Sequence, residues 1–278
     1  MMFNLPIPDG TTAHAVGGTL IALLLGPYAA CIAISVALFI QAIIFGDGGI
    51  LSFGANCFNI AFILPFTGFF IYKILNKIHL SPFYHKCTIF LSAYISINLA
   101  AFFTALELGI QPLLFVDNLG QPLYCPYPLW ISIPAMALSH LTIAGITEGL
   151  FTLSLYLFIL KTSPNIIYDS QQIKLNSIFS LLAFLIIISP LGLIAEGTSW
   201  GEWAPEEILN DTASGVPLGF IPEKLLNGFI YEAFFPDYTI SGTTDILAYI
   251  ASAIIGVALL IIIFKILGSI IYAKKQSL

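Results

Sequence analysis

The sequence predicts an all-α polytopic membrane protein: a transmembrane bundle of about seven helical segments with one long acidic extracellular loop. Of its 278 residues, 58% are apolar and only 9% are charged, whereas a soluble domain carries about 25% charged residues. The mean hydropathy is high, at +0.97. Several apolar runs approach or exceed the roughly 20 residues that a helix needs to cross the hydrocarbon core. We therefore expect a multi-pass protein of the cell membrane.

Turn-forming residues and charges divide the apolar sequence into the expected helices. They cover residues 12–25, 28–45, 51–76, 82–108, 129–161, 177–195 and 246–272. The fifth is too long for one straight span, and we expect it to bend at Pro134 and Gly145.

The first expected helix is short. Thr12 is a residue type that favours a helix N-cap, so His14 falls in the first turn. The pair Gly26-Pro27 combines a helix stop with a helix start. At 1.5 Å per residue this helix extends only about 21 Å, so we expect a re-entrant or packed-in element.

The lysines predict how the helices are oriented. They gather in three groups: Lys73, Lys77 and Lys86; Lys161 and Lys174; and Lys265, Lys274 and Lys275. By the positive-inside rule these ends are cytoplasmic. Counting helices then places residues 6–14, 45–50, 109–128 and 196–245 together on the outer face.

Residues 196–245, named here the acidic loop, have an unusual composition. Their acids are Glu196, Glu202, Glu206, Glu207, Asp211, Glu223, Glu232, Asp237 and Asp245, against the single base Lys224. Trp and Tyr residues in the loop predict a cap anchored at the membrane interface. Two interpretations stay open: a surface that concentrates cations, or an ordinary solvated loop.

Composition and motifs exclude several functions. Every basic residue is Lys, and the chain has no basic face for nucleic acid. The four cysteines lack C-x-x-C spacing and lie mostly inside apolar runs, which is typical of small core residues rather than a thiolate metal site. Metalloprotease, phosphate-loop and serine-hydrolase motifs are missing from the sequence. We expect neither an enzyme nor a prosthetic group.

Two of the four histidines lie in or beside apolar segments, where ionisable groups are costly and often functional. A histidine at a helix N-terminus, as expected for His14, is held neutral by the helix dipole, and neutral imidazole is the form that binds metals. His140 precedes Glu148 by two helical turns, which leaves the two about 80° apart on an ideal helix. The alternative for this pair is hydrogen bonding between packed helices. His79 and His85 are expected on the surface.

Asn56 and Asn59 lie three residues apart, on one face of the third expected helix. The predicted topology puts both near the outer surface, where they can reach the loop that carries His14. The alternative is that they only pack helices together.

Four motifs in order make the chain resemble the CbiM/NikM family, the substrate-binding membrane components of energy-coupling-factor importers for cobalt and nickel. They are Pro6–His14 (PIPDGTTAH), Leu24–Ala30 (LLGPYAA), Gln41–Gly49 (QAIIFGDGG) and Gly54–Asn59 (GANCFN). The resemblance continues through His140–Gly149. The tail is similar to the small CbiN/NikN subunit. We expect a metal-capture core at residues 1–195 and a C-terminal extension at residues 196–278.

The resemblance implies a protein that captures Co(II) or Ni(II) outside the cell. A coupling membrane subunit and cytoplasmic ATPases would then drive uptake. In the family, nitrogen ligands from a Met-His start and from a Gly-Thr-x-x-His motif hold the metal, and the last of these maps onto His14. We expect Thr11, Thr12, Asn56 and Asn59 to support that ligand, with His140 and Glu148 as weaker polar candidates.

This sequence departs from the family pattern at its start, Met1-Met2-Phe3, which has no histidine at position 2. The resemblance leads us to expect a preceding segment on the order of 40–50 residues, two helices in length. The alternatives are a subunit that only assembles the importer without binding metal, and a component specific for a vitamin. Cobalt and nickel accept the same ligands, so the sequence does not choose between them.

Overall fold

The computed structural model describes residues 4–7, 11–14, 16–78, 81–163, 175–194, 200–210, 217–229 and 231–276. Side chains of the two strands, including Thr11, Thr12 and His14, lie outside this description, as does His79. In chain order the elements are β1 (Asn4–Ile7), β2 (Thr11–His14), α1 (Gly18–Leu25), α2 (Pro27–Ile40), η1 (Gln41–Phe45), α3 (Phe53–Asn56), η2 (Cys57–Ile63), α4 (Leu64–Leu75), α5 (Pro82–Leu114), α6 (Leu129–Ser139), η3 (His140–Ala144), α7 (Gly145–Thr162), α8 (Leu175–Ile188), η5 (Ser189–Ile194), α9 (Pro205–Asn210), α10 (Glu223–Leu226), η6 (Pro236–Tyr238) and α11 (Asp245–Gln276).

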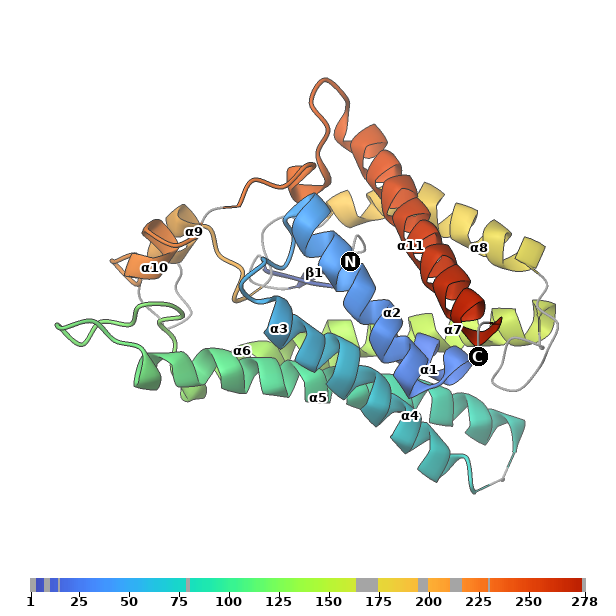
Figure 1. Ribbon diagram of the computed structural model, residues 1–278. Helices are drawn as coiled ribbons and strands as arrows, with labels where there is room; N and C mark the ends of the chain where they lie inside the picture. The colour runs from blue at the N-terminus through green and yellow to red at the C-terminus, as the bar shows by residue number, and fades with distance from the viewer. Residues whose placement is uncertain are drawn as a thin grey trace.

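Helices dominate the structure, as predicted (Figure 1). Within the described residues, five helical stretches are long and apolar enough to cross a membrane, and a shorter apolar one follows α7. The five are Pro27–Phe45, Phe53–Leu75, Pro82–Leu114, Leu129–Thr162 and Asp245–Ile270, and the shorter one is Ile178–Ile194. The predicted multi-pass membrane bundle is confirmed.

Three of the long helices contain a π-helical turn, a feature often found at functional sites. These turns are η1 at the end of α2, η2 between α3 and α4, and η3 between α6 and α7. The expected helix at residues 129–161 corresponds to α6, η3 and α7, and its irregular segment is η3. This turn begins six residues after Pro134 and ends directly before Gly145, the two positions where the sequence predicts bending.

The start of the first helix is where the sequence prediction was wrong. Residues Thr11–His14 form strand β2, paired antiparallel with β1 so that Asn4 lies opposite His14. Helix α1 begins only at Gly18, after Gly17 with φ +70°. Thr12 is thus not an N-cap, and His14 is not in the first helical turn. The N–H groups of Val16 and Gly17, between this strand and α1, are bound by a distant carboxylate, described below.

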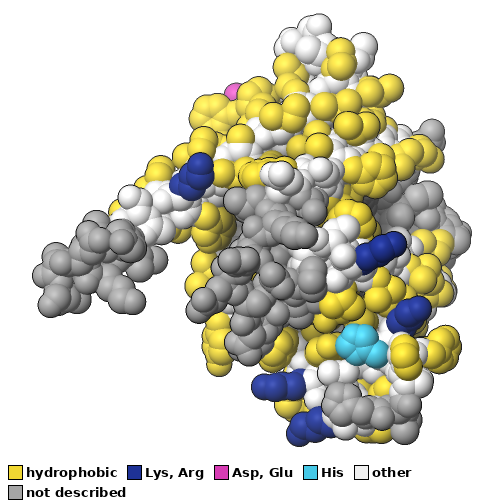
Figure 2. Space-filling model, turned by 90° about the vertical axis from the view of Figure 1, so that its right-hand side faces the viewer, with side chains coloured by type: hydrophobic (Ala, Val, Ile, Leu, Met, Phe, Trp, Pro, Cys, Tyr) yellow, Lys and Arg dark blue, Asp and Glu magenta, His cyan; other side chains and the backbone are white. Residues whose placement is uncertain are grey.

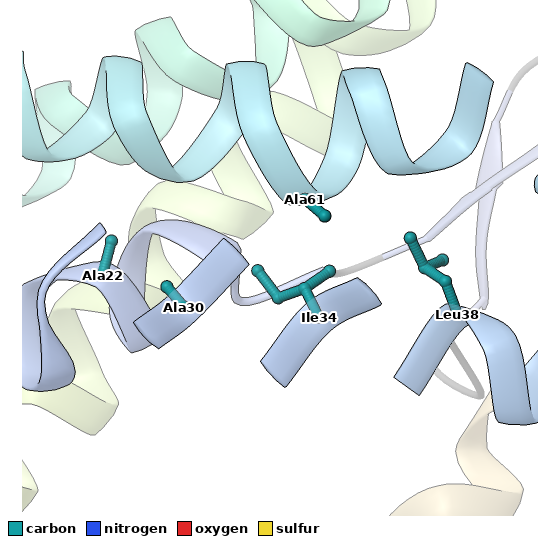
Figure 3. Packing of buried hydrophobic residues seen from close by; sticks show 5 residues of the cluster. All are labelled: Ala22, Ala30, Ile34, Leu38 and Ala61. Atoms are coloured by element: carbon teal, nitrogen blue, oxygen red, sulfur yellow. The ribbon is translucent and has the colours of Figure 1, made fainter. Parts of the chain in front are cut away.

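Small side chains let the first helices approach closely. Ala22 of α1, Ala30 and Ile34 of α2, and Ala61 of η2 meet in one buried cluster with Leu38 (Figure 3). Helix α1 packs between α4 and α7, and α5 packs along α4, α6 and α7. This packing holds the short α1, and the strand that precedes it, in the middle of the bundle.

The two ends of the bundle differ in charge. Figure 2 shows the end where several Lys side chains gather with little acidic surface beside them. At the opposite end, named here the acidic end, the acidic loop is bound to the turns between the membrane helices: Phe235 N–H donates to Ile44 O (2.8 Å), and Lys224 N–H donates to Leu123 O (3.0 Å). The end of η1 and the described parts of segments 109–128 and 196–245 therefore lie together at this end of the bundle.

Candidate functional site

A cavity of about 270 Å³, with several polar side chains in a largely apolar wall, lies at the acidic end, between η2, α5, η3 and the acidic loop. Its polar lining includes Asn56, Asn59, Glu107, Gln111, His140 and Glu202. Val16, two residues after His14, also lines it, and strands β1 and β2 both contact η3. The fold thus brings three predicted site residues, Asn56, Asn59 and His140, to one cavity beside the strand that carries His14.

Asn59 is a buried polar residue in the wall of this cavity. It is 3% exposed, and its Nδ2 donates to Glu107 Oε2 at 2.7 Å. Its Oδ1 is buried and has no hydrogen-bond partner among the described residues. Buried polar atoms are normally paired, because an unpaired one keeps its full desolvation cost. Asn59 therefore presents an unused carbonyl oxygen next to a carboxylate.

Asn56 supports the neighbouring glycine turn. Its Nδ2 donates to Gly48 O at 2.9 Å, and Ser52 Oγ donates to the same carbonyl. Gly48 has φ +74°, a backbone conformation that residues with a side chain rarely adopt. Asn56 thus shapes the wall of the cavity by holding this turn.

His140 is held in one orientation by its own helix. Its Nδ1 lies 2.9 Å from Met136 O and 2.9 Å from Ser139 Oγ. A carbonyl oxygen can only accept, so the bond to Met136 assigns the proton of the neutral ring to Nδ1. The lone pair is then on Nε2. A backbone carbonyl that fixes the tautomer in this way is the usual second partner of a metal-binding histidine.

Glu148 does not join His140 in the cavity. It is 1% exposed, and its two oxygens accept the backbone N–H groups of Val16 (2.9 Å) and Gly17 (2.8 Å). These two N–H groups belong to the residues directly before α1, so Glu148 fixes the backbone that leads from β2 into the helix. Glu148 positions the segment between His14 and α1, which fits the helix-tying alternative for this residue.

Sequence reasoning missed Glu107 and Glu202 as cavity residues. Glu107 is an ionisable residue at the end of the apolar run in α5, and such residues are functional candidates by default. Among the described residues, no group of three His, Cys, Asp or Glu side chains could hold a metal ion. The ring of His14 lies outside that search.

The family follows from comparison with known proteins. Residues 1–166, more than half of the chain, match the family model of the cobalt uptake substrate-specific transmembrane region, CbiM. The chain belongs to the CbiM family. Residues 175–273 match a second family model, the PDGLE domain. The predicted family is confirmed, while the predicted division into two domains at residue 195 stays a prediction.

Similar proteins are described as metal transporters. The probable fused nickel transport protein LarMN of Lactiplantibacillus plantarum is 45% identical over 95% of this chain and 80% of its own length. The fused nickel transport protein NikMN of Rhodobacter capsulatus is 41% identical over 94% of this chain and 80% of its own. A cobalt transport protein CbiM of Clostridium cellulovorans is 31% identical over 58% of each. A crystal structure of a transition metal transporter is 48% identical, with a TM-score of 0.55 over 65% of this chain and 74% of that one.

Proposed function

We propose that this chain captures Ni(II) outside the cell, as the substrate-binding component of an energy-coupling-factor importer. The observation that carries the proposal is the similarity to two fused nickel transport proteins over at least 94% of the chain, which includes both the core and the tail. Co(II) is the second candidate, because relatives of lower identity are named for cobalt and the two ions accept the same ligands. The metal is cargo, not a resident cofactor.

His14 is the proposed metal ligand. Its strand contacts η3, and the chain two residues later lines the polar cavity. The buried Glu148 fixes the backbone directly after this strand. The proposed supporting groups are Thr11, Thr12, Asn56 and Asn59. Imidazole nitrogen is a ligand type that suits Ni(II) and Co(II).

The proposed partners are a coupling membrane subunit and cytoplasmic ATPase subunits. We propose that they contact the lysine-bearing end of the bundle, which the positive-inside rule places in the cytoplasm. No catalytic residue is proposed, because the chain only binds and hands over an ion.

The test is nickel uptake by cells that express the full chain with its partner subunits. His14→Ala is expected to abolish uptake, and His85→Ala serves as the matched control. His85 is a histidine at the lysine-bearing end whose Nδ1 pairs with Asn76 Oδ1 at 3.0 Å. Unchanged uptake in His14→Ala would contradict the site.

The two rival functions give different results. A subunit that only assembles the importer would copurify with its partners while the wild-type chain binds no metal. A vitamin-specific component would be stabilised against thermal unfolding by a vitamin, and Ni(II) or Co(II) would give no such protection.

A further inference from the structure

An apolar crevice of about 400 Å³ lies between helix α11 and helices α1 and α2. Figure 1 shows α11 beside α2, and the two helices contact each other. Ala33 and Ala37 line the crevice from α2, one helical turn apart, and Ile261 and Phe264 line it from α11. The space stays open at this place because the two alanine side chains are short.

The wall of the crevice is apolar and opens toward the outside of the bundle. Among the described residues that line it, Gln41 is the polar one, and its Nε2 donates to Asp47 Oδ2 at 2.6 Å. Ile261 and Phe264 remain 37% and 38% exposed. Because α2 and α11 both belong to stretches that can cross a membrane, this exposed apolar surface borders the hydrocarbon core.

The size and polarity of the crevice restrict what can fill it. Water finds no polar partners in an apolar space at this depth. An empty space is also costly, since the atoms around it lose dispersion contacts. A transmembrane helix is too large, because ten helical residues, about 15 Å long and 10 Å across, already occupy roughly 1,000 Å³ or more. A flexible hydrocarbon chain fits a space of this volume.

A charged residue marks the membrane surface next to the crevice. Lys265 is exposed, follows Phe264, and lies one helical turn beyond Ile261 on the same face of α11. At about 1.5 Å per residue, α11 rises about 30 Å from Asp245 to Lys265, which equals the thickness of the hydrocarbon core. Asp245, the only acid in the sequence of α11, therefore lies at the opposite membrane surface.

Both walls of the crevice reach into the same half of the membrane. Helix α2 begins at Pro27 and approaches the acidic end at Ile44, so Ala33 lies about 9 Å along the helix from the lysine-bearing end. Phe264 lies directly before Lys265 on α11. The crevice thus borders the leaflet that the positive-inside rule makes cytoplasmic, whose surface is negatively charged.

We infer that the crevice binds one phospholipid of this leaflet. Its acyl chain lies between α2 and α11, and its headgroup phosphate contacts Lys265. Anionic headgroups bind more tightly than zwitterionic ones, because a zwitterionic headgroup brings a cation of its own toward the lysine. The lipid joins α2, in the part matched by the CbiM model, to α11, in the part matched by the PDGLE domain model. This role is independent of how the metal is bound.

The first experiment measures lipid retention by the full chain. The chain is purified in a mild detergent, mixed with phosphatidylglycerol and analysed by native mass spectrometry. We expect one tightly retained phosphatidylglycerol per chain. Ala33→Phe fills the crevice with an aromatic ring and should abolish this retention. Ala29→Phe is the matched control, because Ala29 is exposed one turn earlier in α2 and does not line the crevice.

Lys265→Gln tests the phosphate contact without changing the crevice. Removing one lysine charge at a membrane surface should weaken the binding of phosphatidylglycerol about fivefold. Binding of phosphatidylcholine should change less. Lys86→Gln, at an exposed lysine near the start of α5, is the control and should leave the affinity for both lipids unchanged.

Thermal unfolding shows whether the variants are folded. Phosphatidylglycerol should raise the Tm of wild type and of Ala29→Phe, because a ligand that binds only the folded chain stabilises it. Ala33→Phe should match or exceed the lipid-free wild-type Tm, since the ring fills the space, and should gain nothing from the lipid.

Three results would overturn the lipid site. They are a wild-type chain that retains no lipid, which is expected if side chains of a partner subunit fill the crevice; equal retention by Ala33→Phe and wild type; and an affinity for phosphatidylglycerol that Lys265→Gln leaves unchanged. The last result decides the question even if Ala33→Phe fails to fold, because Lys265 is exposed.

Discussion

Glu148 and Glu107 both lie within apolar helices, where an ionised side chain is costly unless it has partners. The two residues offset that free-energy cost with different partners. Glu148 uses both oxygens to accept the Val16 and Gly17 N–H groups, so it fixes the backbone directly before α1. Glu107 bonds Asn59 through one oxygen and faces the cavity. Glu148 is therefore a positioning residue, whereas Glu107 contributes its charge to the cavity lining.

The positioning role of Glu148 can be tested by Glu148→Gln. Glutamine keeps one acceptor oxygen but turns an NH₂ group toward a backbone N–H, so one of the two bonds is lost. We expect a stability loss of about 1–3 kcal/mol and weaker nickel binding, because the strand carrying His14 is no longer fixed. Thermal unfolding and Ni(II) titration of the purified chain measure both effects. Native stability together with native affinity in this variant would refute the positioning role.

The residues of the site were only partly predictable. Asn56, Asn59 and His140 could be chosen from the sequence because polar side chains in apolar helices are conspicuous. That these three side chains line the same cavity could not be predicted, because it depends on how η2, η3 and α5 pack. Glu107 was available to the same reasoning, because it is an acid near the end of an apolar run.

At the scale of elements, α1 is eight residues long and its position depends on close packing. A Cβ on Gly68 of α4 would overlap the Thr19 side chain of α1. On the other side, the Thr19 and Ser96 hydroxyls are 2.7 Å apart and share a hydrogen bond. These contacts fix α1, and with it the direction of the preceding strand.

Gly68→Ala tests this dependence. The added methyl group must push α1 away from α4, so we expect a loss of about 1–3 kcal/mol in stability, typical of an overpacked core. Gly54→Ala is the matched control, because a Cβ there meets nothing within 4 Å and alanine favours a helix. Thermal unfolding of the two variants measures the difference. Equal unfolding temperatures would show that α1 is not held by this contact.

Helices from residue 28 onward were predictable because length and hydropathy determine which segments can span a membrane. The hairpin of β1 and β2 was not, because a threonine before an apolar run also fits a helix N-cap. The backbone that follows the hairpin is held by Glu148, more than 130 residues away, and such a contact cannot be seen in the local sequence. The π-helical turns likewise depend on tertiary packing and leave no clear mark on hydropathy.

At the scale of the molecule, Asp47 makes one of the polar contacts that hold the acidic loop against the core. Asp47 accepts from Gln41 Nε2 (2.6 Å) and from the Tyr238 hydroxyl, and the Tyr238 ring stacks on Phe45 at 4.9 Å between centroids. Asp237 and Tyr238 have positive φ of 48° and 61°. Such values are uncommon for non-glycine residues and are kept only where surrounding contacts enforce them. Burial and the Asp47 charge raise the pKa of Tyr238 well above its usual value, so the hydroxyl remains a donor.

We expect the docking of the acidic loop onto the core to depend on pH through Asp237. Burial, and then the charge of Asp47, raise the pKa of this carboxyl above its ordinary value of 3.8. The docked state therefore binds a proton more readily than the undocked one, so docking is strongest at acid pH and weakens as pH rises through the raised pKa. As the pH rises from 3.8 through the raised pKa of Asp237, hydrogen exchange of the backbone amides of residues 231–242 should accelerate. The increase should exceed the one that pH alone causes in an unstructured chain. Asp237→Asn should remove this extra dependence, and an unchanged pH profile in the variant would contradict the assignment.

Nickel K-edge X-ray absorption on the full chain, loaded with less than one equivalent of Ni(II), tests the central claim most directly. At this loading the ion occupies the site of highest affinity. The proposed function predicts a nitrogen-containing shell with imidazole scattering that is lost in His14→Ala and retained in His85→Ala. An identical spectrum for wild type and His14→Ala, or a shell of oxygen ligands alone, would show that His14 is not the ligand that captures the metal.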